Sequence, residues 1–139
     1  MNPRVEAYRS QIGKEIQFDY PILKYLGFVV MEAEEGYIKV EMKARRELLN
    51  PLGLLHGGVM AMLMDELIGA AGWTLNRPTH FVTINLNIDF LSSAREDEIL
   101  VAEGKIVRPG KNVMHGESKI FNSSGKLLAK SASNLIKVG

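Results

Sequence analysis

The most regular hydrophobic pattern in the chain runs from residue 82 to residue 90, where apolar and polar residues alternate at every position. Alternation with a period of two is typical of a β-strand with one buried face and one polar face. Shorter apolar segments, bounded by Gly, Pro, Asn or Ser, predict five more strands. These strands are expected at residues 28–34, 37–42, 98–108, 113–121 and 127–137.

A long apolar segment, residues 57–75, predicts a helix that is buried inside the protein. Only Asp65 and Glu66 interrupt it, and proline in the following Asn-Arg-Pro sequence ends it. Each of these carboxylates would cost about 2.5–3.5 kcal/mol at the centre of a membrane span, so we do not expect one. A helix with apolar side chains on all sides must be covered by other parts of the protein on nearly every side.

The order of the predicted elements indicates an α+β fold in which one curved antiparallel sheet wraps a long central helix. Two short helices are expected before it, at residues 3–14 and 21–26. We interpret residues 1–139 as one domain, with residues 1–20 as an N-terminal helical extension. The sheet leaves at least one long edge strand to be protected, and homodimerisation is the simplest way to protect it.

Composition excludes several kinds of site and partner but does not indicate a particular function. The chain has 139 residues and no cysteine, which excludes disulfides, thiolate metal sites and cysteine nucleophiles. The 17 basic and 16 acidic side chains are scattered, so neither nucleic acid nor an anionic membrane is an expected partner. The N-terminal sequence lacks the basic-then-apolar pattern of a signal peptide, which predicts a cytoplasmic protein.

The start of the long helix is the first candidate for chemistry. The preceding turn has no Ser, Thr, Asp or Asn at the usual N-cap position, so the first backbone N–H groups are expected to be available. Gly57 and Gly58 leave that helix end open, and its dipole attracts a developing anion, which suits it to polarising a carbonyl oxygen. Alternatively, the glycines permit close helix–strand contact or a positive φ.

Asp65 is the second candidate, because no residue three or four positions away on the helix can neutralise it. It needs a partner from another segment or subunit, a wet pocket, or a raised pKa suited to a general base. A structural ion pair or plain surface exposure is the alternative. Glu66 points about 100° away around the helix, so the two carboxylates are not expected to share one site.

Thr83 and His56 are weaker candidates when taken alone. Thr83 is expected on the polar face of its strand beside Asn85 and Asn87, where it could hold a water molecule, although threonine is also an ordinary strand residue. A histidine in a turn, such as His56, is more often a structural residue than a catalyst. The three histidines lack metal-ligand spacing, so no metal is predicted.

Taken together, three segments resemble the hotdog-fold acyl-CoA thioesterases of the PaaI-like group. They are NPLGLLHGGVMAMLMD at 50–65, TINLNIDFL at 83–91 and VRPGK at 107–111. The likeness extends over about residues 20–137. It implies a thioester hydrolase that needs no cofactor beyond the coenzyme A of its substrate, forms a homodimer or homotetramer, and builds its site between two subunits.

The resemblance also implies roles for individual residues. The Gly57 N–H would polarise the thioester carbonyl, while Asn50 and His56 would shape the turn and assist around the leaving sulfur. Asp65 of the facing subunit would be the nucleophile or the base that activates water, and Thr83 would help to place that water. Glu66 would be a bystander. Gly58 is expected to contact the substrate. Basic side chains are expected at the coenzyme A phosphates, namely Arg77, Arg108 and Lys111.

Two other functions remain open at this point. A non-catalytic acyl-CoA-binding domain would keep the fold and the pocket without needing Asp65. A hotdog enoyl-CoA hydratase or dehydratase would use a differently placed histidine and acid. The acyl group is not determined, because an apolar pocket discriminates one methylene by only about 1–3 kcal/mol.

Overall fold

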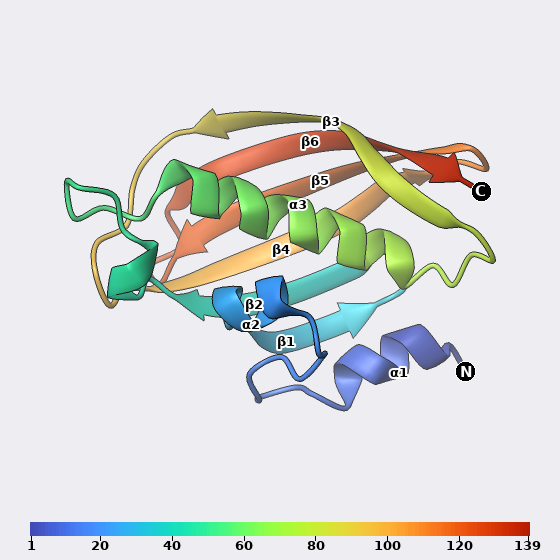
Figure 1. Cartoon of the computed structure of the whole chain (residues 1–139), viewed down its shortest axis with the longest axis horizontal. Coiled ribbons are helices and arrows are strands. Elements are labelled where there is room, and N and C mark those ends of the chain that lie inside the picture. Colours follow the sequence, from blue (N-terminus) through green and yellow to red (C-terminus); the bar gives the residue numbers. More distant parts are fainter.

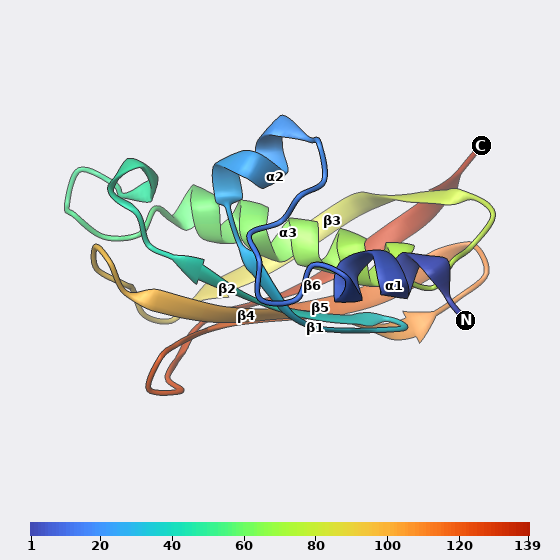
Figure 2. The same cartoon turned by 90° about the horizontal axis from the view of Figure 1, so that it is seen from below.

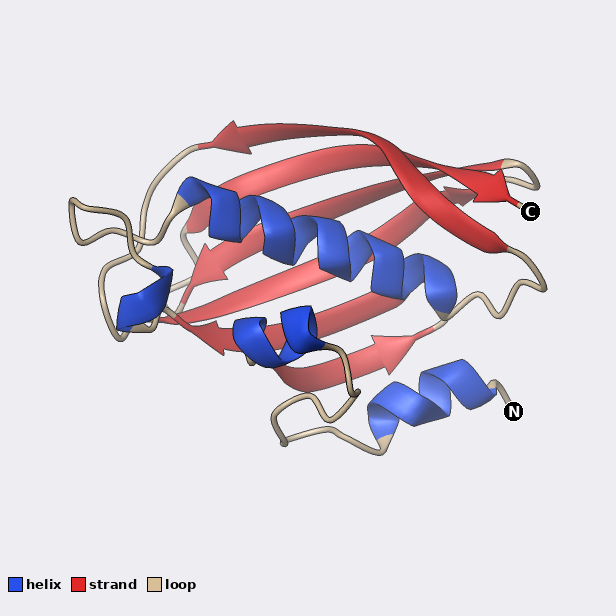
Figure 3. Ribbon diagram, in the orientation of Figure 1, coloured by secondary structure: helices blue, strands red, loops and turns tan.

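All 139 residues are described by a computed structural model, in which a six-stranded antiparallel sheet curves around one long helix (Figures 1 and 3). The helices are α1 (Pro3–Arg9), α2 (Pro21–Leu26) and α3 (Gly57–Trp73), with a short 3₁₀ helix η1 (Arg46–Leu48). The strands are β1 (Val29–Glu34), β2 (Tyr37–Lys43), β3 (His80–Phe90), β4 (Ile99–Pro109), β5 (Val113–Asn122) and β6 (Leu127–Val138). The α+β fold with a central helix is therefore confirmed.

The strand order in the sheet is β1-β2-β4-β5-β6-β3, so the chain crosses from one side of the sheet to the opposite edge through α3. The β1–β2 hairpin turns at Gly36, whose φ of +74° is readily adopted by glycine. This order leaves β1 and β3 as the two edges. The first helix is shorter than expected, because the chain leaves the α-helix at Arg9.

The concave face of the sheet carries α3, which lies close to the backbone of the central strands (Figure 2). A Cβ atom at Gly104 would lie 2.4 Å from the Leu67 carbonyl oxygen, and one at Gly116 would lie 2.6 Å from a methyl group of Ile68. Both glycines are therefore required by close approach of the helix. The apolar residues of α3 that face this side, including Leu63 and Leu67, are fully buried.

We expect the Gly104→Ala variant to lose about 3 kcal/mol of unfolding free energy, at the upper end of the usual cost of overpacking a core. The added methyl group meets rigid backbone rather than a flexible side chain, so α3 must move away from the sheet. Chemical denaturation measures the loss. The control is Gly69→Ala, which adds the same methyl group where nothing lies within 4 Å. Gly125 is unsuitable as a control because its φ of +87° disfavours alanine.

The N-terminal segment packs against a flank of α3 that the sheet does not cover. Helix α1 lies beside β1 (Figure 1), and α2 stands farther from the sheet than α3 (Figure 2). The Asn2 side chain caps α1 and donates a hydrogen bond of 2.6 Å to the Thr74 carbonyl oxygen just after α3. Arg9 donates one of 2.8 Å to the Ala33 carbonyl oxygen in β1. Helix α2 begins at Pro21 and ends at Gly27, as expected, with Gly27 in the left-handed region.

Strand β3 differs from the expectation of one buried and one polar face. Its apolar side chains are largely exposed at the sheet edge, with Ile84 at 55% and Phe90 at 52% exposure. The pairing with β6 also shifts between Thr83 and Asn85, which is a β-bulge. A bulge changes the direction in which the neighbouring side chains point.

None of the helices is both long enough and apolar enough to span a membrane.

Candidate active site

The N-terminus of α3 is capped by a histidine, which the sequence analysis did not foresee. The His56 Nδ1 atom accepts a hydrogen bond of 2.8 Å from the Gly58 N–H. The expectation that both glycine amides are available is therefore wrong for Gly58. Because Nδ1 is the acceptor, the neutral His56 ring carries its proton on Nε2, which leaves an exposed N–H donor beside the helix start.

Gly57 keeps its backbone N–H free, since it makes no hydrogen bond within the chain. It is the first residue of α3, where the N–H has no partner inside the helix. The aromatic ring of Phe90 borders it, at 3.6 Å from the position of a Cβ atom. One oriented, half-buried amide thus points out of the positive end of a 17-residue helix.

Asn50 holds the loop before α3 in shape. Its Oδ1 atom accepts hydrogen bonds from the N–H groups of Leu52 and Leu54, at 2.9 and 3.2 Å. Its backbone N–H donates to the Leu54 carbonyl oxygen, and Gly53 in the same turn has a φ of +77°. The structural part of the expected Asn50 role therefore agrees with the geometry, and its side-chain NH₂ group stays unpaired.

Asp65 and Thr83 lie together although they are 18 residues apart in the sequence. The Thr83 hydroxyl donates a hydrogen bond of 2.8 Å to one Asp65 carboxylate oxygen, and the carboxylate has no ion pair. The β-bulge explains this contact, because it turns Thr83 toward α3. The expected placement of Thr83 on the same face as Asn85 and Asn87 is therefore wrong. The second Asp65 oxygen stays free to accept a proton.

The two halves of the candidate site do not meet within one chain. Asp65 is eight residues after Gly57 on α3, which separates them by about 12 Å along the helix axis. Reacting groups must approach to about 3–3.5 Å, so a single carbonyl cannot contact both. Gly57 and Asp65 can act on one carbonyl only if they come from different copies of the chain.

The three basic residues expected at the coenzyme A phosphates gather at the β4–β5 turn, beyond the C-terminal end of α3. Arg77 is partly occupied there, since its guanidinium donates to the carbonyl oxygens of Pro109 and Gly110 at 2.6 and 3.2 Å. Arg108 and Lys111 flank the same turn and are exposed. Two of the three cations are thus free, while Arg77 holds the turn.

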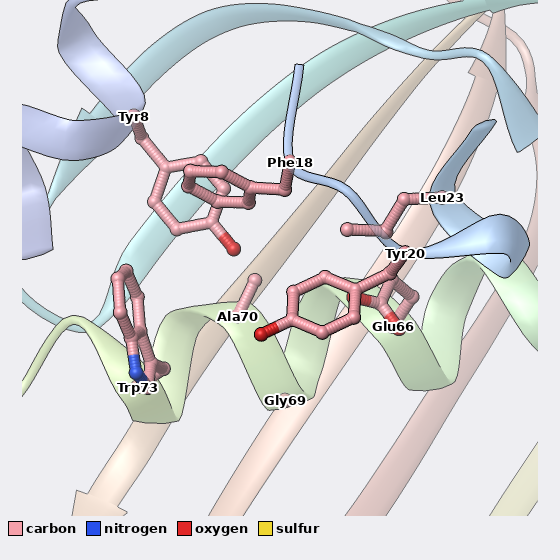
Figure 4. Close-up of a pocket in the computed structure, with 8 residues that line it drawn as sticks. All are labelled: Tyr8, Phe18, Tyr20, Leu23, Glu66, Gly69, Ala70 and Trp73. Atoms are coloured by element: carbon pink, nitrogen blue, oxygen red, sulfur yellow. The ribbon is translucent and has the colours of Figure 1, made fainter. Parts of the chain in front are cut away.

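Glu66 does not share the site of Asp65, as expected, but it lines a cavity of about 350 Å³ between α3 and the N-terminal extension (Figure 4). Burial raises the pKa of the Glu66 carboxyl, and the neighbouring Asp65 charge raises it further. No hydrogen bond or ion pair to its side chain offsets this cost. The cavity is otherwise mainly aromatic, lined by Tyr8, Phe18, Tyr20, Leu23, Gly69, Ala70 and Trp73.

We expect the Glu66→Gln variant to be more stable than the wild type at neutral pH. The folded-state pKa of Glu66 is raised, so its ionised form costs stability once the pH exceeds the ordinary value of 4.5. Below that value both the folded and the unfolded states are protonated, and the difference between variant and wild type should vanish. Thermal unfolding across this pH range measures it. A gain that persists at acid pH would contradict the explanation.

The aromatic cavity is what the sequence analysis missed. Tyr8, Phe18 and Tyr20 lie in the N-terminal segment outside the motifs, and they have no shared spacing that predicts a common wall. Trp73, at the end of α3, lines this cavity as well. A second, smaller cavity of about 110 Å³ borders Gly69 and Trp73 on the β3 side and includes Arg4.

Comparisons with known proteins show the family and the fold of the chain. The family model described as "Thioesterase superfamily" matches residues 52–129. A putative esterase of Archaeoglobus fulgidus is 32% identical over 137 residues, which covers 95% of this chain and 87% of the relative. Acyl-coenzyme A thioesterase 13 of Homo sapiens is 30% identical over 102 residues, 73% of each chain. The solved structure of the E. coli PaaI protein from the phenylacetic acid degradation operon superposes with a TM-score of 0.81 at 24% identity, covering 87% of this chain and 86% of that one.

Proposed function

The chain belongs to the thioesterase superfamily and is a thioester hydrolase, and on this premise we propose that it hydrolyses acyl-coenzyme A thioesters to the free acid and coenzyme A. The observation that carries the proposal is that one helix presents both a free Gly57 N–H and a carboxylate oxygen of Asp65 without a hydrogen-bond partner. The curated relative named acyl-coenzyme A thioesterase 13 supports the substrate class.

The active site is built between two copies of the chain that pair along β3. This edge exposes an apolar surface, and the neighbouring α3 carries both reactive groups about 12 Å apart. A two-fold axis at the edge sets the helices antiparallel, so Gly57 of one copy faces Asp65 of the other. Each dimer then holds two equivalent sites.

Hydrolysis proceeds by stabilising an anion on the carbonyl oxygen while a water oxygen attacks the carbonyl carbon. The Gly57 N–H and the helix dipole stabilise the oxyanion. The free Asp65 oxygen accepts the proton of the attacking water, which the Thr83 hydroxyl oxygen orients while its hydrogen stays on Asp65. Direct attack by Asp65, followed by hydrolysis of the resulting anhydride, gives the same products.

The leaving sulfur departs beside the His56 ring. The cap on Gly58 leaves the Nε2–H of His56 as a donor, which stabilises the departing thiolate. Arg108 and Lys111 supply positive charge for the coenzyme A phosphates at the exposed β4–β5 turn. A thioester needs less activation than an amide, so this set of groups is sufficient without a metal ion.

A screen of acyl- and aryl-CoA thioesters with detection of the released thiol tests the proposed function. Turnover of several members of the panel supports it, and binding without release of thiol contradicts it. An enoyl-CoA added to the panel distinguishes hydrolysis from hydration, because only hydration removes the absorbance of the conjugated enoyl group without releasing thiol.

We expect the Ile84→Lys variant to be monomeric and to lose activity about 100- to 1,000-fold, the usual cost of removing one oxyanion donor. The new charge lies on the exposed β3 edge and opposes pairing of two copies, which removes the partner's Gly57 from the site. Light scattering and thiol release measure the two effects. The Val107→Lys variant places the same charge at a similarly exposed position on β4, and it should stay dimeric and active.

A further inference from the structure

The cavity between α3 and the N-terminal extension has the walls of an aromatic box. Tyr8, Phe18 and Trp73 pack edge to face with ring centroids 5.1–6.1 Å apart and interplanar angles of 65–86°. The ring of Tyr20 stands across from them, and the hydroxyl groups of Tyr8 and Tyr20 point toward the space above Ala70 (Figure 4). Rings set at steep angles present both faces and edges to a ligand.

Glu66 is the one charged side chain that lines this box. It is partly buried and makes no hydrogen bond or ion pair with the protein. Arg4 lies over the Trp73 ring at 5.1 Å, but it belongs to the neighbouring cavity and makes no ion pair with Glu66. The box therefore contains an unpaired negative charge with no counter-ion from the chain.

Aromatic faces and a carboxylate together suit a positively charged nitrogen that carries alkyl groups. Ring faces attract such a cation within about 6 Å of their centroids, and an alkylammonium group loses less hydration on burial than a small ion. A neutral ring would fill the same space but would bury Glu66 further without pairing its charge, which is costly. The combination favours a cationic ligand over a purely apolar one.

Gly69 connects this box with the proposed catalytic carboxylate. It follows Asp65 by four residues and therefore lies on the same side of α3, one turn later. It is exposed, a Cβ atom there would meet nothing within 4 Å, and it lines both the aromatic box and the smaller neighbouring cavity. An acyl chain whose carbonyl is held at Asp65 can pass over this residue into the box.

We propose that the box is a subsite for an alkylammonium group at the far end of the acyl chain, with Glu66 as its counter-ion. This substrate class rests on the proposed function. Glu66 is then a specificity-determining residue rather than a bystander. Burial of this carboxylate beside the Asp65 charge raises its pKa, and this is the stability cost of that recognition.

Binding to the box is measured without any catalysis. Trp73 is the sole tryptophan of the chain and lines the box, so its fluorescence reports directly on occupancy. We expect tetramethylammonium chloride to change this fluorescence saturably, against a sodium chloride control. The change should be lost in Glu66→Gln and retained in Glu117→Gln, which removes the same charge from an exposed position on β5. No saturable change in the wild type overturns the subsite.

A pair of thioesters tests whether the acyl chain carries the cation. One acyl-CoA ends in a trimethylammonium group three methylenes from the carbonyl, and the other ends in a tert-butyl group of the same shape. We expect the wild type to favour the charged substrate about tenfold in kcat/KM, and Glu66→Gln to bring the ratio close to one. Gly69→Leu, which fills the passage, should also reduce the ratio.

The outcomes separate this inference from the proposed function. If neither thioester nor any other acyl-CoA is hydrolysed, the proposed function fails, while the fluorescence titration still decides the subsite. If both are hydrolysed with equal efficiency, or if the ratio is unchanged in Glu66→Gln, the inference is overturned and the proposed function stands. Saturable fluorescence without a substrate preference overturns the acyl-chain source of the cation.

Discussion

Replacement of Asp65 by Asn is expected to lower kcat/KM for acyl-CoA thioesters about a thousandfold, which corresponds to about 4 kcal/mol of lost transition-state stabilisation. Asn keeps the size of the side chain and can still accept the hydrogen bond from Thr83. It cannot accept a proton or attack a carbonyl. Steady-state assays of thiol release with purified variant and wild type measure the loss.

The matched control for this variant is Glu117→Gln, because Glu117 is an exposed carboxylate on β5, away from the β3 edge along which the two copies pair. It removes the same charge and is expected to keep full activity. A wild-type rate in Asp65→Asn would rule out both catalytic roles of the carboxylate. A loss of the same size in Asp65→Ala would show that the carboxylate, rather than the hydrogen bond with Thr83, is responsible.

Gly57→Pro is expected to lower kcat about 100- to 1,000-fold while the protein stays folded. Proline removes the backbone N–H, and Gly57 is the first residue of α3, where proline is well tolerated. His56 before it has φ −63° and ψ +131°, which is compatible with a following proline. The substitution therefore removes one hydrogen-bond donor with little change to the helix.

Comparison with Gly57→Ala separates the N–H from the side chain. Alanine adds a Cβ atom at an ordinary 3.6 Å from the Phe90 ring and keeps the N–H, so its loss should be far smaller than that of the proline variant. Thermal unfolding of both variants shows whether the fold is retained. Equal losses in the two variants would mean that the space at residue 57, and not its amide, is what the reaction needs.

The sequence predicted the sheet and the central helix well because their signals are local. The apolar segment of α3 and the turns at Gly36 and between β4 and β5 mark elements that do not depend on distant contacts. Thr83 was placed on the wrong face because a strict period of two cannot reveal a bulge, which arises from pairing with β6. The His56 cap was missed because histidine is not among the usual N-cap residues.

The cavity around Glu66 depends on tertiary structure, which the sequence does not display. Its wall comes from α1, the segment after it, α2 and one side of α3, and these elements meet only after the chain has folded back. A resemblance limited to residues 20–137 leaves Tyr8 and Phe18 outside or at the margin of the motif-bearing region. Gly57 and Asp65, by contrast, could be named from the sequence, because a helix start without an ordinary N-cap residue and a carboxylate without a helical partner are local features. Their roles came from the resemblance.

The close contact of α3 with Gly104 and Gly116 bears on how this protein can evolve. Side chains on that side of the helix have almost no freedom to change, since even a methyl group on the strands would displace it. The opposite side borders the N-terminal extension and α2 rather than the sheet, and a Cβ atom added at Gly69 meets open space. On the proposed function, selection can therefore alter which acyl groups are accepted by exchanging residues on this outer surface, while the spacing of Gly57 and Asp65 along α3 is inherited unchanged.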